Sequence, residues 1–303
     1  MSEKIYSKVY ELPTGHASKD VTKGCIVLEG GALRGVYVSG VLDALMEKGI
    51  NFETTIGVSA GALNGFNYVA GQIGRSARAS LKYRHDKRYM GIKAFKQNHG
   101  VFGFDFLIKD YNEIEPIDFD SFNDPARRFV AVASNLHTGK PAYFERGKCK
   151  NIMAAIRASA SMPYVTRPVV MSGVPYLDGG CTNKIPYRWA LDQGYDKVVI
   201  VRSRPETYRK KESSKRSMKM AERFYRDYPE FAQALGQSND NYNRQCEEIL
   251  DLKGQGKVFV ISPSVPITVS HVERDMEKLG KLYNLGYDDT IRNLWTLHDY
   301  LES

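Results

Sequence analysis

Thr54-Thr55-Ile56-Gly57-Val58-Ser59-Ala60-Gly61 is the stretch that decides the fold, because it runs from a strand-like apolar segment directly into a glycine-flanked serine. A helix-like run follows from Leu63 to Ala70. The turn is too tight for side chains at Gly57 and Gly61, and the helix aims its first N–H groups at the turn. Such a strand-to-helix turn holds a serine hydroxyl out as a nucleophile. The stretch therefore predicts a serine hydrolase in which Ser59 is the nucleophile.

The composition is that of an ordinary soluble globular protein, with 303 residues of which 42% are hydrophobic and 26% charged. No apolar run approaches the roughly 18–20 residues that span a bilayer. The first residues, MSEK, lack the apolar stretch of a secretory signal. The four cysteines show no CxxC spacing, so we expect reduced thiols and neither a disulfide framework nor a zinc site. The chain is predicted to be cytoplasmic.

The net charge of +8 favours an anionic partner, and its distribution is uneven. Ten Lys or Arg residues fall within residues 202–226, with Phe224 and Tyr225 at the far end of this basic segment. Two interpretations remain open: a helix face in contact with water, or an interfacial helix attracted to the anionic head groups of a membrane. Nucleic-acid binding is not expected, because no recognised nucleic-acid motif accompanies the charge.

Strand and helix patterns alternate along the chain, which predicts an α/β fold: a three-layer α/β/α sandwich around a mainly parallel central sheet. Strands are expected near residues 25–28, 53–57, 129–133, 140–145, 174–177, 197–201 and 257–261. Helices are expected near residues 38–48, 63–70, 150–160, 185–193, 214–252 and 270–300.

One domain is predicted over residues 23–303, after an irregular N-terminal arm at residues 1–22. Its core motifs lie in residues 24–203, and residues 204–303 form a helical extension. Residues 75–115 are basic and aromatic and are predicted to form a helix and a covering loop, a candidate lid.

A second motif, Gly30-Gly31-Ala32-Leu33-Arg34-Gly35, also lies between a strand and a helix. Its small residues leave backbone N–H groups uncovered, which can stabilise a developing oxyanion. Arg34 has two open roles: pairing with an acid to fix the loop, or facing a substrate phosphate. Nucleotide patterns fail here, because Gly-Lys-Ser/Thr is absent and Ala32 stands where the dinucleotide motif has glycine.

A third motif, Tyr176-Leu177-Asp178-Gly179-Gly180, places Asp178 at the end of a predicted strand. All three motifs would then meet at the edge where the carboxyl ends of parallel strands gather and ligands bind. A carboxylate within hydrogen-bond reach of Ser59 can act as its base if a partly buried site raises its basicity.

A histidine triad is the competing arrangement. The order Ser59, Asp178 and then His271 or His298 matches the sequence of roles in α/β-hydrolases. Neither of these histidines lies in a loop typical of a catalytic triad, and neither does His137, which lies in a glycine-containing turn. We therefore expect each to be an ordinary exposed histidine.

Together these three motifs resemble the patatin-like phospholipase family. The likeness extends to ASNLHTGKPAYF at residues 133–144, ASASMPYVTRPV at 158–169 and DGGCTNKIP at 178–186. It covers about residues 24–203, with a looser likeness in YNLGYDD at 283–289. The combination is specific, although each piece alone is not.

The resemblance implies a Ser–Asp dyad without histidine, in which Ser59 is the nucleophile and Asp178 the base. Gly30, Gly31 and their neighbours Ala32, Arg34 and Gly35 would shape the oxyanion hole. The implied reaction is acyl-ester hydrolysis of phospholipids or lysophospholipids through an acyl-enzyme, with no metal or cofactor.

Ala32 departs from the three consecutive glycines typical of this family. Its methyl group disfavours positive φ, so we expect altered loop geometry with activity retained. Two alternatives to the dyad enzyme remain. One is a Ser-His-Asp esterase or thioesterase, and the other is a lipid- or membrane-binding regulator without turnover.

Overall fold

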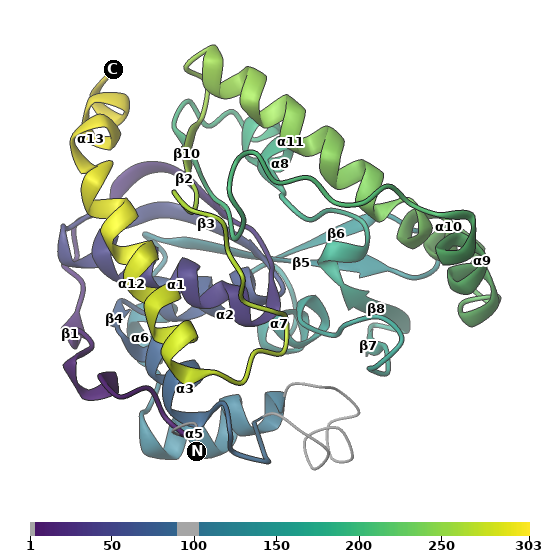
Figure 1. Cartoon of the computed structure of the whole chain (residues 1–303), viewed down its shortest axis with the longest axis horizontal. Coiled ribbons are helices and arrows are strands. Elements are labelled where there is room, and N and C mark those ends of the chain that lie inside the picture. The colour runs from purple at the N-terminus through teal and green to yellow at the C-terminus, as the bar shows by residue number, and fades with distance from the viewer. Residues whose placement is uncertain (1–3, 90–102) are drawn as a thin grey trace.

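The centre of the protein is an eight-stranded sheet, seen in a computed structural model that describes residues 4–89 and 103–303 (Figure 1). The strands of this sheet are β2 (Thr22–Leu28), β3 (Phe52–Val58), β5 (Arg128–Asn135), β6 (Pro141–Glu145), β7 (Val169–Met171), β8 (Val174–Asp178), β9 (Val198–Val201) and β10 (Phe259–Ile261). Their order is β10-β9-β2-β3-β5-β8-β7, with β6 also paired to β5. The five strands from β10 to β5 are parallel, whereas β6, β7 and β8 pair in antiparallel fashion.

The central strands are buried on both faces, which explains their almost continuous apolar sequences. In β2, Ile26 and Leu28 pack against the helices on one face of the sheet. Cys25 and Val27 of the same strand pack against the helices on the other face, as the alternation of side chains requires. The predicted mainly parallel sheet is confirmed.

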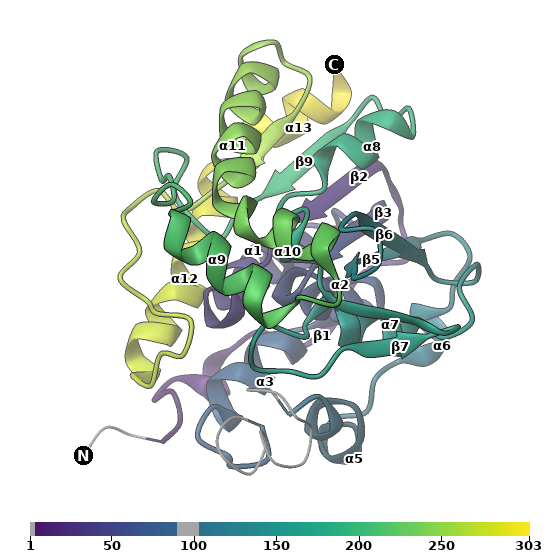
Figure 2. The ribbon, with the colours of Figure 1, turned by 90° about the vertical axis from the view of Figure 1, so that its right-hand side faces the viewer.

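Helices cover both faces of the sheet and confirm the predicted α/β/α sandwich (Figures 1 and 2). On one face lie α1 (Gly35–Glu47), α2 (Ala60–Val69), α3 (Arg75–Tyr83), α6 (Phe119–Phe122), α7 (Ile152–Ser159), α12 (Met276–Arg292) and α13 (Leu294–Glu302). On the other face lie α8 (Tyr187–Asp192) and α11 (Ser238–Gly254). At one end of the molecule α9 (Lys215–Phe224) and α10 (Pro229–Gly236) pack side by side. The remaining short elements are η1 (Val9–Glu11), β1 (Gly15–His16), η2 (Ala32–Arg34), β4 (Gln72–Ile73), η3 (Phe106–Asp110), α5 (Tyr111–Ile114) and η4 (Gly179–Cys181).

Strands β3 and β8 share one edge of β5. Val132 of β5 pairs with Val58 of β3, and the next residue, Ala133, pairs with Asp178 of β8. Both β5 residues also pair with β6, which must therefore occupy the opposite edge. The ends of β3 and β8 consequently meet head-on, so that Ser59, which follows Val58, arrives beside Asp178.

This arrangement differs in one respect from the predicted one. The sequence pattern placed Asp178 at the carboxyl end of a strand parallel to the others. In the structure β8 is antiparallel to β5 and approaches the same edge from the opposite direction. The site forms because two strands running toward each other end at the same place.

Residues 4–21, which belong to the predicted N-terminal arm, contain η1 and β1 and bury Tyr6, Val9 and Leu12 against the core. The Tyr6 hydroxyl accepts a hydrogen bond from Asn284 of α12 at 3.2 Å. The described part of this segment is therefore packed on the helical layer. Of the candidate lid at residues 75–115, the structure gives α3, η3 and α5, and residues 90–102 lie outside the described residues.

Helix α12 crosses α1 so closely that the contact requires glycine. A Cβ atom built at Gly286 would lie 2.1 Å from the Tyr37 carbonyl oxygen. We expect Gly286→Ala to lower the free energy of unfolding by about 1–3 kcal/mol, because overpacking forces the two helices apart. Urea denaturation followed by circular dichroism measures the change.

Gly254→Ala is the matched control for this prediction, because a Cβ atom built there near the end of α11 meets open space. It should leave stability unchanged or raise it by up to about 1 kcal/mol, since alanine favours the helix over glycine. Equal effects of the two substitutions would contradict the close-crossing explanation.

Candidate active site

Ser59 lies at the junction of β3 and α2 in a strained backbone conformation, with φ 56° and ψ −122°. A non-glycine residue with positive φ is uncommon and is found where the surrounding structure enforces it. Part of that enforcement comes from α7, because the Ser59 N–H donates to the Ser159 hydroxyl at 2.8 Å. The strain turns the Ser59 side chain away from the helix that it begins.

The two glycines of the turn are needed for close approach, as the sequence suggested. A Cβ atom at Gly57 would lie 2.5 Å from the Gly61 carbonyl oxygen, and one at Gly61 would lie 2.4 Å from the Leu28 carbonyl oxygen. Both distances are too short for any side chain. The turn therefore packs β3, α2 and the end of β2 together through their backbones.

Asp178 reaches Ser59 at the end of β8. Its carboxylate accepts a hydrogen bond from the Gly180 N–H at 2.7 Å. The side chain is buried, and this burial raises the pKa of Asp178 from 3.8 to about 6. The nearby Ser59 hydroxyl, the Gly180 N–H and the ammonium of Lys184 oppose that rise. A carboxylate of this kind is more basic than usual yet still ionised at neutral pH.

The loop predicted to form an oxyanion hole lies over Ser59. Ala32 has φ 50°, so the methyl group that departs from the usual glycine sits in a left-handed conformation, which costs about 1–2 kcal/mol. Among residues 4–89 and 103–303, no acceptor is found for the N–H groups of Gly31 and Ala32. The first N–H of α2, at Ala60, also lacks a capping side chain. Ala60 was not among the predicted site residues, although the serine turn itself places its N–H there.

Of the two roles left open for Arg34, pairing with an acid is not the one seen, because its side chain contacts a histidine. It is 5% exposed, and its Nη2 lies 2.6 Å from His271 Nε2. Because a guanidinium only donates, His271 Nε2 must be the acceptor and its ring is neutral. Burial and the charges of Arg34, Lys210 and Arg204 lower the pKa of His271 to about 4.

The other two histidines lie apart from Ser59 and Asp178. His298 is exposed on α13, and His137 is exposed and contacts the ring of Tyr228. His271 is therefore the one candidate triad histidine that lines a pocket with Ser59, and its Nε2 is already occupied by Arg34. His271 is exposed, as expected, but its contact with Arg34 through the loop before α12 was not predicted from the sequence.

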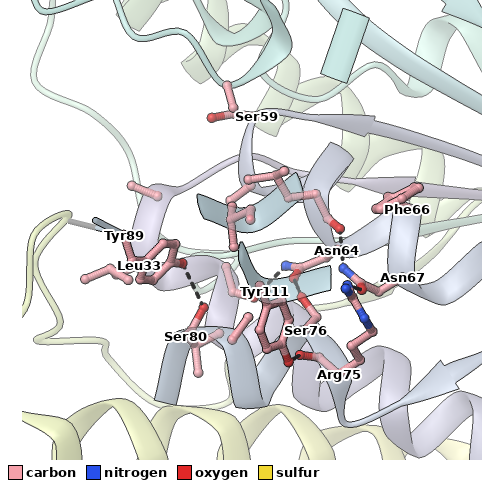
Figure 3. A pocket seen from close by; sticks show the side chains of 18 of the residues that line it. Leu33, Ser59, Asn64, Phe66, Asn67, Arg75, Ser76, Ser80, Tyr89 and Tyr111 are labelled. Atoms are coloured by element: carbon pink, nitrogen blue, oxygen red, sulfur yellow. Dashed lines mark hydrogen bonds between the residues drawn. The ribbon is translucent and has the colours of Figure 1, made fainter. Parts of the chain in front are cut away.

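An apolar cavity opens on one side of Ser59, between α2, α3 and η3 (Figure 3). Its apolar walls are formed by Leu33, Val36, Leu63, Phe66, Leu107 and Met162. Polar groups gather at the end far from Ser59, where Arg75 donates to Asn67 at 2.6 Å. Since these polar groups are satisfied by each other, the cavity is suited to an apolar occupant.

The family model described as Patatin-like phospholipase matches residues 26–191. The chain belongs to the patatin-like phospholipase family. This confirms the resemblance drawn from the three motifs. A second family model, Domain of unknown function (DUF6363), matches residues 228–302 and so covers most of the helical extension.

Similar proteins match a little over half of this chain. Uncharacterized protein YjjU of Escherichia coli is 30% identical, over 59% of this chain and 52% of its own. Probable lipid hydrolase 463L of Invertebrate iridescent virus 6 is 29% identical, over 55% of this chain and 62% of its own. The chain thus spans about half the length of the curated relatives it matches. The match to the solved structure of VipD from Legionella pneumophila covers 98% of this chain and 71% of VipD, with 12% identity and a TM-score of 0.47.

Outside the patatin-like match, the basic segment at residues 202–226 divides into two parts. Arg202 is fully buried and lies 4.0 Å from Glu29, and both Arg204 and Lys210 line a pocket beside Ser59. From Lys215 onward the cations are exposed, and all of them except Arg226 lie on α9. The sequence interpretation treated the segment as one helix face, because linear charge density does not show which side chains turn inward.

The buried charge of Asp178 has a consequence for stability. Its folded-state pKa, about 6, lies above the ordinary value of 3.8, so the carboxylate destabilises the fold above pH 6 and does so less as the pH falls. We expect Asp178→Asn to raise the free energy of unfolding by up to about 3 kcal/mol at pH 7.5 and by about half as much at pH 5. Urea denaturation at the two pH values tests this.

The exposed Asp192→Asn variant is the control and should change stability at neither pH. A loss of stability in Asp178→Asn that is equal at both pH values would contradict the prediction. It would show that the carboxylate matters as a hydrogen-bond acceptor and not through its buried charge.

Proposed function

We propose that this chain hydrolyses acyl esters of phospholipids or lysophospholipids, with Ser59 as the nucleophile and Asp178 as its base. One observation carries the proposal: the Ser59 hydroxyl lies beside the buried, basic carboxylate of Asp178, at the mouth of an apolar cavity. A serine hydroxyl is a weak nucleophile unless a neighbouring base accepts its proton, and Asp178 is placed to do so.

In the first half of the reaction, Asp178 accepts the Ser59 proton as Oγ attacks the acyl carbonyl carbon. The carbonyl oxygen becomes an oxyanion that the N–H groups of Gly31, Ala32 and Ala60 can bind. Each preorganised donor of this kind contributes roughly 10²–10³ to the rate. When the carbon–oxygen bond to the alcohol breaks, the alcohol leaves with the proton from Asp178 and Ser59 is acylated.

In the second half, water replaces the alcohol. Asp178 accepts a proton from the water as its oxygen attacks the acyl-enzyme, and the same N–H groups bind the second oxyanion. Collapse of this intermediate frees the fatty acid, and Asp178 returns the proton to Ser59 Oγ. The cycle uses one base twice and needs no histidine.

The apolar cavity supports a lipid as the source of the acyl group. It begins at Ser59 and ends at side chains whose polar groups are already paired, so an acyl chain fits it better than a polar group does. The printed name of one relative, Probable lipid hydrolase 463L, points to the same substrate class.

The two alternatives are weaker on specific grounds. A Ser-His-Asp triad needs a histidine nitrogen free to accept the Ser59 proton, and His271 Nε2 accepts from Arg34 instead. A regulator without turnover has no need for a strained serine turn beside a buried carboxylate, since both features cost stability.

Contact with an anionic membrane surface belongs to the same proposal. Helix α9 carries exposed cations together with Met220 and Phe224, which are 52% and 59% exposed. Exposed apolar groups among cations are typical of an interfacial helix. Within residues 4–89 and 103–303, no helix is both long and apolar enough to cross a bilayer. We propose a cytoplasmic enzyme that meets its substrate at the membrane surface.

The proposed dyad predicts that Ser59→Ala and Asp178→Asn each lower the hydrolysis of a short-chain nitrophenyl ester at least about 10³-fold. Wild-type protein should also be labelled by a fluorophosphonate probe, and Ser59→Ala should not. Ser270→Ala and Asp192→Asn, both exposed, are the matched controls and should retain full activity.

Three outcomes of this experiment would contradict the proposal. Full activity in either dyad variant would refute the assigned roles. A loss in His271→Ala as large as that in Asp178→Asn would favour the triad. Absence of probe labelling and of any hydrolysis, with liposome binding retained, would favour the regulator.

The pH dependence of the reaction follows from Asp178. Its pKa is raised to about 6 and it must be ionised to accept a proton, so kcat/KM should fall tenfold per pH unit below about pH 6. Lys184 favours the ionised form of Asp178. Lys184→Met should therefore raise the pH at which kcat/KM begins to fall by a few tenths to about one pH unit. Steady-state kinetics from pH 4.5 to 8 measure both effects. If the pH at which kcat/KM falls is the same in Lys184→Met as in the wild type, a group other than Asp178 controls the fall.

A further inference from the structure

A second pocket opens on the other side of Ser59, away from the apolar cavity. Four cations, Arg34, Lys184, Arg204 and Lys210, line it, and His271 lies among them. We name these five residues the cation pocket. The proposed dyad chemistry explains none of these charges except that of Lys184.

The cations of this pocket lack carboxylate partners. Across the described residues, 4–89 and 103–303, no ion pair involves any of the four. Arg34 is 95% buried, and its Nε has no hydrogen-bond partner in the part of the chain that the structure describes. The Nε of Arg204 is buried in the same way and finds no partner among those residues. Buried donors of this kind are costly unless something accepts from them.

The two carboxylates that line the pocket are already engaged. Glu29 accepts from the Ser203 N–H at 2.6 Å and faces the Nε of Arg202 at 4.0 Å. Asp178 accepts from the Gly180 N–H and lies beside Ser59. The pocket therefore holds four cations against two carboxylates, an excess of positive charge.

The cations of the pocket also lower one another's pKa values. Burial, together with the charge of Arg204, lowers the pKa of Arg34 to about 10, and burial with the charge of Lys210 lowers that of Lys184 to about 8. Burial and the charges of Arg34 and Arg204 lower the pKa of Lys210 as well. Arrangements of mutually repelling charges persist in proteins where they serve a ligand of opposite sign.

The side chains are held in place by the helical extension. Lys210 lies over the Tyr242 ring at 5.2 Å, and Arg204 lies over the Tyr208 ring at 4.4 Å. Asn243 of α11 bonds both the N–H and the carbonyl oxygen of Lys210. These contacts fix the cations and also occupy the faces of the aromatic rings. A quaternary ammonium group, which binds to open aromatic faces, therefore has no place here.

We infer that the cation pocket binds a phosphate monoester, the head group of a phosphatidate-like lipid whose acyl ester lies at Ser59. Such a group carries a charge of about −1.5 to −2 and accepts several hydrogen bonds, which suits the excess of cations and the buried guanidinium Nε donors of Arg34 and Arg204. Tyr242 and His271 belong to residues 228–302, so this part of the chain forms one wall of the head-group site. The inference rests on the proposed function, because it names the substrate class of the same site.

The first test is selectivity. Full-length protein should hydrolyse phosphatidic acid with a kcat/KM at least about tenfold above that for phosphatidylcholine with the same acyl chains, in mixed micelles. The ratio should fall toward one in the Arg204→Gln/Lys210→Gln double variant. It should stay at the wild-type value in Lys19→Gln/Lys48→Gln, a matched control that removes two exposed cations outside both the cation pocket and α9. A ratio near one in the wild type, or an equal fall in both double variants, would overturn the inference.

The second test separates the pocket from catalysis. Short-chain phosphatidic acid and inorganic phosphate are each titrated into Ser59→Ala protein by calorimetry. The lipid should bind at least about tenfold more tightly than phosphate, because it also fills the apolar cavity, and binding of both should be lost with Arg204→Gln/Lys210→Gln added.

Equal affinities would assign the pocket to free phosphate and overturn the head-group inference. If the wild type hydrolyses the neutral nitrophenyl ester but the Ser59→Ala protein binds neither phosphate nor phosphatidic acid, only the head-group inference is overturned. If the protein binds these ligands but shows no hydrolysis that depends on Ser59, only the proposed function is overturned.

Discussion

The pairing of β5 with two different strands along one edge is the constraint on which the site depends. β3 occupies that edge as far as Val132, and β8 takes it over from Ala133, running in the opposite direction. The two strand ends must therefore abut, and their backbone pairing with β5 places Ser59, which follows β3, beside Asp178, which ends β8. Neither residue depends on a flexible loop for its position.

The abutting strands leave little room, so the residues around them are small and some have strained backbone conformations. Gly57 and Gly61 pack backbone against backbone, while Ser59 and Ala32 adopt positive φ. A buried carboxylate and several unpaired cations add further unfavourable energy. The core on both faces of the sheet outweighs these costs, since the parallel strands are buried throughout. Unfavourable local geometry and charge are thus concentrated around Ser59, where binding and catalysis can use them.

Much of this could be predicted from local pattern. Strands of the parallel core are short apolar runs followed by glycine turns, and a strand pattern of that kind is set by burial on both faces. The serine turn, the glycine loop and Asp178 each carry their own local signal. The direction of β8 did not, because a short strand pattern of four residues is the same in a parallel or an antiparallel pairing. His271 was likewise missed, since the loop that brings it to Arg34 is separated from that residue by most of the chain.

The sequence by itself determined which residues have the chemistry for the site and which elements carry them, because turn geometry and side-chain burial are local properties. Only the tertiary structure decided which of the cations in residues 202–226 face water and which turn toward Ser59. It also decided that residues 228–302 close the pocket. Those outcomes depend on contacts between segments far apart in the chain, and such contacts leave no periodic signal in either segment.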